Sequence, residues 1–193
     1  PLKRGIFHDL MAAHPELDAE ELKQALALHT RSTRYLSVMA SGQPRHDLQG
    51  QAVEALAPEH IHHALLEVFR RRQQRSNEDL QPKLRQRIVQ ALQASGLSRE
   101  AYAELVRGRN EQANAVLDAA LAEAAARDAR DEALLRTFEA SGQSDAAAFA
   151  AMYGLHPREV SQSLARAQQR QAALRAAQAA AADTPTDHTD AAA

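Results

Sequence analysis

Alanine is very abundant in this 193-residue chain, whereas aromatic residues make up only 4% of it and Trp is absent. Without large rings, a core has to be assembled from Leu, Ile, Val and Ala, and small side chains of this kind fill space well on closely packed helices. With 45% hydrophobic residues, the chain can bury one sizeable core, or a small domain and a helical extension. We therefore expect a mainly α-helical protein of one or two domains.

The composition also restricts location and chemistry. There is no Cys, which excludes disulfides and thiolate metal sites and is compatible with a reducing compartment. No apolar run approaches the ~18 residues of a membrane span. The chain begins at Pro1 without an initiator Met or a signal-peptide pattern. We expect a cytoplasmic protein with no membrane partner, whose natural N-terminus lies upstream of Pro1.

Charge is distributed unevenly along the chain. The formal net charge of -2 would argue against a nucleic-acid partner if it were spread uniformly. From Ile88 onward ten Arg face fourteen acids, a balance of 10 - 14 = -4. Between residues 70 and 87, however, seven basic residues face two acids, a balance of 7 - 2 = +5. The basic residues of this run are Arg70, Arg71, Arg72, Arg75, Lys83, Arg85 and Arg87.

Helical periodicity begins near the N-terminus. Apolar residues at helical spacing predict a short amphipathic helix over 5–13, which Pro15 stops. Asp18, followed three residues later by Glu21, resembles a capping box and predicts the start of a second helix. One face of this second helix should carry Leu22, Ala25, Leu26 and His29.

Two further helices are expected before residue 75. Ser32 favours N-cap geometry, so a helix should begin there and end near Gly42. Pro58 is suited to the first turn of the next helix. The inward residues of that helix should be Ile61, Leu65, Val68 and Phe69.

A short β-hairpin is predicted between these two helices. Leu48 and Val53 flank a Gln49-Gly50 turn, and alternation of apolar and polar residues over 46–53 is typical of short strands. The expected fold class is therefore mainly α with a small β-hairpin.

The polar stretch Ser76–Pro82 interrupts helical periodicity and is the best domain boundary in the chain. Beyond it the sequence is Ala-rich and helical until about Arg175, after which Ala, Thr and Asp predominate. We expect a compact domain at 1–75, a basic polar linker at 76–87, an α-helical extension at 88–175 and a disordered tail at 176–193.

A weak internal repeat at an offset of 46 residues suggests that the extension contains two related helical hairpins. Shared Ala carries little information, so chance similarity is an equal alternative. The matching segments are Ala94-Ser95-Gly96 with Ala140-Ser141-Gly142, Ser98 with Ser144, Ala101 with Ala147, and Gly108 with Gly154.

Four blocks near the N-terminus resemble the RNA-binding domain of the ProQ/FinO family in order and spacing. The blocks are Pro1-Leu2-Lys3-Arg4-Gly5-Ile6-Phe7, Leu22 through Leu28, Ser32-Thr33-Arg34-Tyr35-Leu36, and Pro44-Arg45-His46-Asp47-Leu48 with Gly50. The Arg-Tyr-Leu motif alone is common, whereas the ordered set over residues 1–72 is specific. The resemblance implies a compact ProQ/FinO-like domain that precedes the helical extension.

The resemblance also implies a partner class. Members of the family bind terminator-like hairpins and single-stranded 3′ ends, so structured RNA, including small regulatory RNAs and mRNA 3′ ends, is the expected partner. A-form RNA hides its base edges in a deep groove and is read through shape, phosphates, 2′-hydroxyls and unpaired ends. An RNA chaperone acting in post-transcriptional regulation, by protecting RNAs or promoting their pairing, needs no cofactor and is not an enzyme.

Tyr35 and Arg45 correspond to the residues that line a 3′-end pocket in the family. Tyr offers a stacking face and a hydroxyl, and Arg offers a planar fork for two phosphate oxygens. Without the resemblance, Tyr35 would be interpreted as a core aromatic residue whose hydroxyl finds a backbone partner. With it, contact with RNA is the favoured interpretation.

The resemblance also implies RNA contacts at Lys3, Arg4, Lys23, Arg31 and Arg34, and at Thr30 and Ser32, where the amides at the start of a helix meet the duplex phosphates. Lys23 and Arg34 would lie about 20° apart around a continuous helix and could form one cationic stripe. Because of the break near Thr30 this angle need not apply, and the alternative is an ordinary solvated face of the helix. Ala27 departs from family members that carry a basic residue there, which puts one duplex contact in doubt. The basic run at 70–87 is a candidate extension of the RNA contact.

Three histidines lie between Glu59 and His63. His60 and His63 are three residues apart, and no further ligand completes the spacing of a zinc site. We therefore expect no metal and a solvated helix start.

The extension from Ile88 onward has two competing interpretations. Ala150, Gly154 and Val160 occupy the small, turn and apolar positions of a helix-turn-helix, which would make this part a DNA-binding regulator. The default is a helical scaffold for a protein partner, for self-association or for a second RNA contact, because the extension is net acidic. No catalytic or phosphate-loop motif occurs anywhere in the chain.

Overall fold

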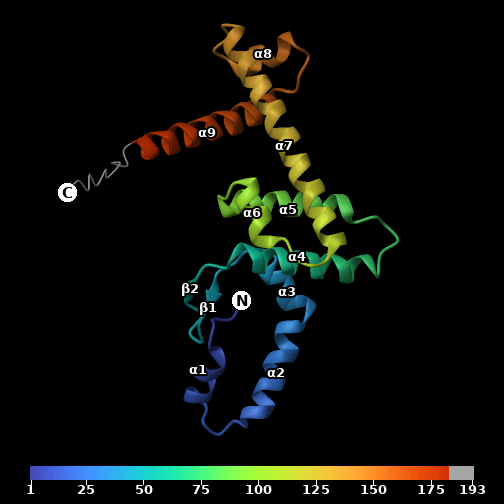
Figure 1. The fold of residues 1–193 in the computed structure, drawn as a ribbon, viewed down its shortest axis with the longest axis vertical. Coiled ribbons are helices and arrows are strands. Elements are labelled where there is room, and N and C mark those ends of the chain that lie inside the picture. The colour runs from blue at the N-terminus through green and yellow to red at the C-terminus, as the bar shows by residue number, and fades with distance from the viewer. Residues whose placement is uncertain (183–193) are drawn as a thin grey trace, which may run out of the picture. The chain divides into compact units, whose positions relative to one another are not determined.

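A computed structural model describes residues 1–182 and shows a mainly helical chain with one small antiparallel sheet (Figure 1), which confirms the expected fold class. No described helix is both long and apolar enough to cross a bilayer. The elements are α1 (Ile6–Ala13), α2 (Ala19–Arg31), α3 (Thr33–Met39), β1 (Arg45–His46), β2 (Ala52–Glu54), α4 (Pro58–Gln73), α5 (Gln81–Ser95), α6 (Arg99–Val106), α7 (Glu111–Ala140), α8 (Ala146–Met152) and α9 (Pro157–Ala182).

The first three helices begin where the sequence predicts. The Asp18 carboxylate accepts hydrogen bonds from the backbone N–H groups of Glu20 and Glu21 and so caps α2. Ser32 has an extended backbone (φ -64°, ψ 146°) that ends α2, and its hydroxyl accepts a hydrogen bond from Tyr35 N at the start of α3. One serine therefore sets the bend between α2 and α3.

The predicted hairpin is present and contains an additional segment. In β1 and β2, Arg45 pairs with Glu54 and His46 with Ala52. The N-terminal residue Leu2 forms a parallel bridge with His46, supported by hydrogen bonds from Lys3 N to His46 O (2.8 Å) and from His46 N to Pro1 O (2.8 Å). Leu2 thus adds an isolated parallel bridge to the two-stranded sheet, a contact that the sequence does not predict.

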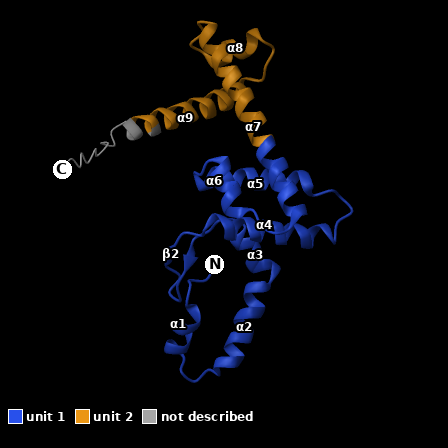
Figure 2. Ribbon diagram, in the orientation of Figure 1, with its two compact units in different colours: residues 1–122 blue, residues 123–193 orange. Residues whose placement is uncertain are grey.

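Helix α4 is at the centre of the first compact unit, residues 1–122 (Figure 2). It packs against α3, α5 and α6, and its buried residues are His62, Ala64, Leu65 and Val68. Leu65 and Val68 are inward as predicted, whereas Ile61 and Phe69 are only half-buried. The rest of this core comes mainly from later helices: Leu84, Ile88, Val89, Leu92, Tyr102, Leu117 and Ala120.

The expected linker at 76–87 differs from the structure. The loop between α4 and α5 covers only residues 74–80, and the Gln73 side chain closes it by bonding Glu78 O (2.9 Å) and Leu80 N (2.9 Å). Pro82 lies in the first turn of α5, where proline favours a helix start, and Leu84 is buried in the core. The first compact unit therefore extends past the predicted boundary to residue 122.

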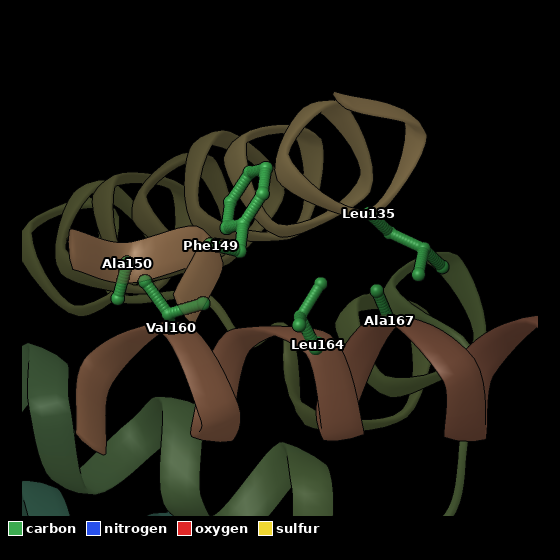
Figure 3. Close-up of a cluster of buried hydrophobic side chains, with 6 residues drawn as sticks. All are labelled: Leu135, Phe149, Ala150, Val160, Leu164 and Ala167. Atoms are coloured by element: carbon green, nitrogen blue, oxygen red, sulfur yellow. The ribbon is translucent and has the colours of Figure 1, made fainter. Parts of the chain in front are cut away.

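The second compact unit begins at Glu123 and has its own core (Figure 3). The side chains of Leu135, Phe149, Ala150, Val160, Leu164 and Ala167 form this core. Asp131 lies against the core, almost fully buried, and receives two hydrogen bonds of 2.8 Å from the Arg166 guanidinium. Helix α9 continues to Ala182, so residues 176–182 of the predicted tail are helical, and residues 183–193 lie outside the described residues.

The repeated segments have similar local structure. Gly96 and Gly142 both adopt a left-handed backbone (φ 68° and 69°) after the helix that precedes them. The short helix that follows each turn carries a fully buried aromatic residue four positions after its N-cap, Tyr102 in α6 and Phe149 in α8. The turn after Gly142 is one residue longer than the turn after Gly96. Corresponding residues of the two copies are therefore 46 positions apart before the turn and 47 positions apart after it.

Candidate functional site

The two residues assigned to the pocket, Tyr35 on α3 and Arg45 on β1, meet at Leu2. The Tyr35 hydroxyl accepts a hydrogen bond from Leu2 N at 3.1 Å, and Arg45 Nη1 donates to Leu2 O at 3.0 Å. A tyrosine hydroxyl that accepts a bond still has its own proton to donate. Tyr35 can therefore hold the N-terminal segment at Leu2 and at the same time offer a hydrogen bond to a ligand oxygen.

Arg45 is fixed on both sides. Its Nε lies 3.3 Å from Glu54 Oε1 across the sheet, and the side chain is only 12% exposed. The buried Nε is not aligned for a hydrogen bond with that carboxylate, so the pair is a close charge contact. Arg45 thus presents a preorganised cation at the sheet, with a small part of its surface open to solvent.

His29 extends the site, although nothing in the sequence indicates that it belongs there. Its ring lies edge-on to Tyr35 with 5.2 Å between centroids, and its side chain is exposed. The bend at Ser32 lies between His29 at the end of α2 and Tyr35 on α3, so helical periodicity within α2 does not reveal this pair. A second ring beside Tyr35 widens the surface on which a base could stack.

The predicted cations near the N-terminus have acidic partners in the structure. Lys3 Nζ lies 2.7 Å from Asp9 Oδ2, a hydrogen bond that raises the pKa of the Lys3 ammonium. Arg4 Nε lies 3.7 Å from Glu54 Oε1. Their side chains are 38% and 64% exposed, and such exposed pairs are worth little. Either cation can exchange its carboxylate for a phosphate at small cost.

Helix α2 presents more cations. Lys23 pairs with Glu20 (2.6 Å) and lies 5.8 Å from the centre of the Phe7 ring of α1, which fixes its stem beside the first helix. Arg31 and Arg34 are exposed on either side of Ser32. The hydroxyls of Thr30 and Ser32 bind backbone groups of their own helices, with Thr30 Oγ1 donating to Leu26 O at 2.8 Å. These two residues position the bend rather than display free hydroxyls.

The basic run at 70–87 is not one continuous surface. Arg71 donates to Arg31 O (2.8 Å) and Thr33 Oγ1 (3.1 Å), so it fastens α4 to the α2–α3 bend. Arg70 binds Glu67 through two hydrogen bonds, and these bonds, with a further one from Arg71, lower the pKa of Glu67 to about 2. Near the end of α4, Arg72 lies over the Phe69 ring and Arg75 is exposed. On α5, Lys83 pairs with Glu78, Arg85 is half-buried, and Arg87 donates a hydrogen bond to Ala40 O.

The histidines at the start of α4 are not all solvated, contrary to prediction. His62 is 3% exposed, and its Nδ1 lies 3.3 Å from the hydroxyl of Tyr102, which is itself buried. Burial, and then the neighbouring His63, lower the pKa of His62 to about 4, and burial raises the pKa of Tyr102 to about 12. His62 is therefore a neutral core residue. Residues 1–182 contain no group of ligands that could hold a metal ion.

Comparison with known proteins assigns a family to the N-terminal segment of the sequence. The ProQ/FINO family matches residues 1–81, which contain Tyr35, Arg45 and their neighbours. Relatives named RNA chaperone ProQ include one from Aeromonas salmonicida, 45% identical over 67 residues, and one from Shewanella frigidimarina, 41% identical over 69 residues. These alignments cover 33% and 34% of this chain, and 32% and 34% of the relatives. The chain thus spans about a third of the length of the curated relatives that it matches.

A solved structure is also similar in sequence. The FinO-like RNA chaperone from Neisseria meningitidis is 38% identical and has a TM-score of 0.36, with 39% of this chain and 63% of that chain covered. The blocks at Pro1–Phe7, 22–28, 32–36 and 44–50 all fall within the matched residues. Residues 1–81 are therefore a ProQ/FinO family domain.

Proposed function

We propose that the protein is an RNA chaperone whose N-terminal domain binds RNA hairpins together with their single-stranded 3′ ends. The observation that carries the proposal is the convergence of Tyr35 and Arg45 on Leu2 within a ProQ/FinO domain. Relatives over this segment are named RNA chaperones. Small regulatory RNAs and mRNA 3′ ends in the cytoplasm are the targets that this proposal implies.

The site suits an RNA 3′ end for chemical reasons. A terminal ribose has vicinal hydroxyls and lies next to a phosphate, so it needs a hydrogen-bond donor, a cation and a flat surface. The Tyr35 hydroxyl proton, the Arg45 guanidinium and the edge-on rings of Tyr35 and His29 supply these three groups. The 3′ end would lie against this pocket without any covalent step.

The surrounding cations suit the duplex part of the hairpin. Lys3, Arg4 and Lys23 each have an acidic partner that is at least partly exposed and that a phosphate can replace, and Arg31 and Arg34 are exposed at the bend. Phosphate contacts of this kind release counterions, so affinity should fall as salt rises. Binding of both parts would protect the 3′ end and hold an RNA for pairing.

The test is a titration of a terminator-like hairpin with a 3′ U tail against the full chain and single variants. We expect Tyr35→Ala and Arg45→Ala to weaken binding by at least about tenfold, the effect of one or two lost hydrogen bonds to a charged group. Tyr153→Ala, which removes an exposed tyrosine of the second unit, is the matched control and should leave affinity unchanged. Arg45→Lys keeps the charge but not the fork and should be intermediate.

Thermal unfolding of each variant separates loss of the pocket from loss of the fold. Unchanged RNA affinity in folded Tyr35→Ala and Arg45→Ala variants would contradict the pocket assignment.

A further inference from the structure

The connection between α8 and α9 has the form of a tight helix-turn-helix. Four residues, Tyr153–His156, join the two helices, and Gly154 in the turn has a left-handed backbone (φ 66°). Leu155 N donates to Ala150 O at 2.8 Å and Gly154 N donates to Ala151 O at 3.3 Å. A short turn containing glycine between two crossing helices is characteristic of this motif.

Packing explains the residues on the inner side of the motif. Ala150 of α8 is fully buried, and the small side chain lets α9 approach closely. Val160, Leu164 and Ala167 extend from one side of α9 toward Phe149 and Ala150 (Figure 3). This buried stripe uses the i, i+4, i+7 positions of α9 and leaves the opposite side of the helix to solvent.

The outer side of α9 carries a separate stripe with a different composition. Arg158, Gln162, Ala165 and Gln169 follow one another at i, i+4, i+7 and i+11 and are all exposed. Arg pairs with the edge of guanine and Gln with the edge of adenine in the DNA major groove, and a small residue between them lets the helix approach the bases. The stripe is about 16 Å long, which is the reach of a helix inserted in one groove.

The repeat provides an internal comparison. At an offset of 47, Leu164 and Ala167 correspond to Leu117 and Ala120 of α7, and all four are buried. The outer positions differ, because Arg158, Gln162, Ala165 and Gln169 correspond to Glu111, Ala115, Asp118 and Ala122. Packing therefore requires the inner stripe but not Arg and Gln on the outer one.

The first copy also lacks the tight turn. Gly108 precedes α7 but is not left-handed, and the α6 residue Tyr102 contacts His62 of α4. Asp118, on the outer side of α7, pairs with Arg107. The compared outer positions of this copy carry two acids and neither Arg nor Gln, so the residues that suit base edges occur in the second copy and not in the first.

We propose that α8 and α9 form a DNA-binding helix-turn-helix in which the N-terminal half of α9 enters the major groove and Arg158, Gln162 and Gln169 face the base edges. The partner is duplex DNA rather than duplex RNA, because the major groove of A-form RNA is too deep and narrow to admit a helix. This function is additional to RNA binding by residues 1–81.

Charge determines how this binding should behave. Between residues 123 and 182 seven Arg residues are balanced by seven acids, 7 - 7 = 0. Asp131 and Asp128 on α7 also engage Arg166 and Arg170 of α9. Without excess positive charge, nonspecific attraction to phosphates is weak, so DNA binding should depend mainly on sequence.

The experiment uses the full chain. Duplex DNA of random sequence is selected for binding, and the selected duplex is titrated by fluorescence anisotropy against single variants. We expect an enriched sequence motif, and a loss of about tenfold in affinity for Arg158→Ala and for Gln162→Ala. Arg175→Ala, which removes an exposed arginine farther along the same helix, is the matched control and should bind as the parent does.

Two further titrations distinguish DNA binding from RNA binding. Tyr35→Ala should leave the selected DNA bound, and Arg158→Ala should leave a hairpin RNA with a 3′ tail bound. The proposal is overturned if no motif is enriched, if duplex RNA of the selected sequence binds as well as the DNA, or if Arg158→Ala and Gln162→Ala leave DNA affinity unchanged.

Discussion

The N-terminal domain and the α8–α9 motif differ in whether the same side chains serve both packing and ligand binding. In residues 1–81, the side chains proposed to bind RNA also hold the chain together, since Tyr35 and Arg45 both bond Leu2. In α9, one stripe of side chains packs and the opposite stripe faces solvent. Substitutions in the first region should therefore change stability and affinity together, whereas in the second region a substitution should change only one of the two.

The largest expected difference in unfolding free energy is between two substitutions on opposite sides of α9. Leu164→Ala deletes a core side chain that is 4% exposed and should cost about 3 kcal/mol of unfolding free energy. Gln162→Ala, two residues earlier on the exposed side, should cost nearly nothing. Urea denaturation followed by circular dichroism measures both. Equal costs for the two variants would show that the stripes are not separate.

A pH effect of similar size is expected in the first unit. The pKa of His62 is about 4 in the folded protein and near 6.5 when unfolded. Because the unfolded chain takes up the proton first, stability contributed by neutral His62 is complete above pH ~6.5 and is lost as the pH falls toward ~4. The loss should reach about 3 kcal/mol.

The measurement is chemical denaturation of the parent and His62→Phe at pH 7 and pH 4. The variant should lose less stability on acidification, while His63→Phe, which changes an exposed neighbour, should keep most of the parent's pH dependence because burial is the larger cause of the lowered His62 pKa. An identical pH dependence in His62→Phe and the parent would contradict the buried, neutral assignment.

A smaller effect tests whether fold and function are coupled in residues 1–81. Arg71 fastens α4 to Arg31 O and Thr33 Oγ1, beside the bend that positions Tyr35. Arg71→Ala should cost about 1 kcal/mol of stability and weaken hairpin RNA binding severalfold. Arg136→Ala, which removes an exposed arginine of the second unit, is the control. If Arg71→Ala lowers stability but leaves RNA affinity intact, the bend does not position the site.

Local chemistry made much of the fold predictable from sequence. Asp18 and Ser32 cap helices because their side chains satisfy backbone donors two or three residues away. The hairpin between Arg45 and Glu54 was also predicted from a nearby turn at Gly50. Signals of this kind involve residues close together in the chain, so a pattern of single residues is enough to reveal them.

Long-range contacts were missed for the converse reason. His62 is buried against Tyr102, forty residues later, and Leu2 pairs with His46 across more than forty residues. Arg71 belongs to the basic run that was a candidate RNA contact. In the structure its guanidinium donates a hydrogen bond to Arg31 O, a partner forty residues earlier that the sequence does not indicate. The ordered sequence blocks indicated Tyr35 and Arg45, but not that the two residues share Leu2.

A 3′-end site at Tyr35 and Arg45 can be tested with one hairpin RNA that carries either a 3′ hydroxyl or a 3′ phosphate on its tail, titrated against the full chain and Tyr35→Phe. If the Tyr35 hydroxyl donates to the terminal ribose, the parent should prefer the free hydroxyl end by about tenfold. The variant, which keeps the ring but lacks the donor, should lose most of that preference. Equal affinity of the parent for both ends would contradict a 3′-end site at Tyr35 and Arg45.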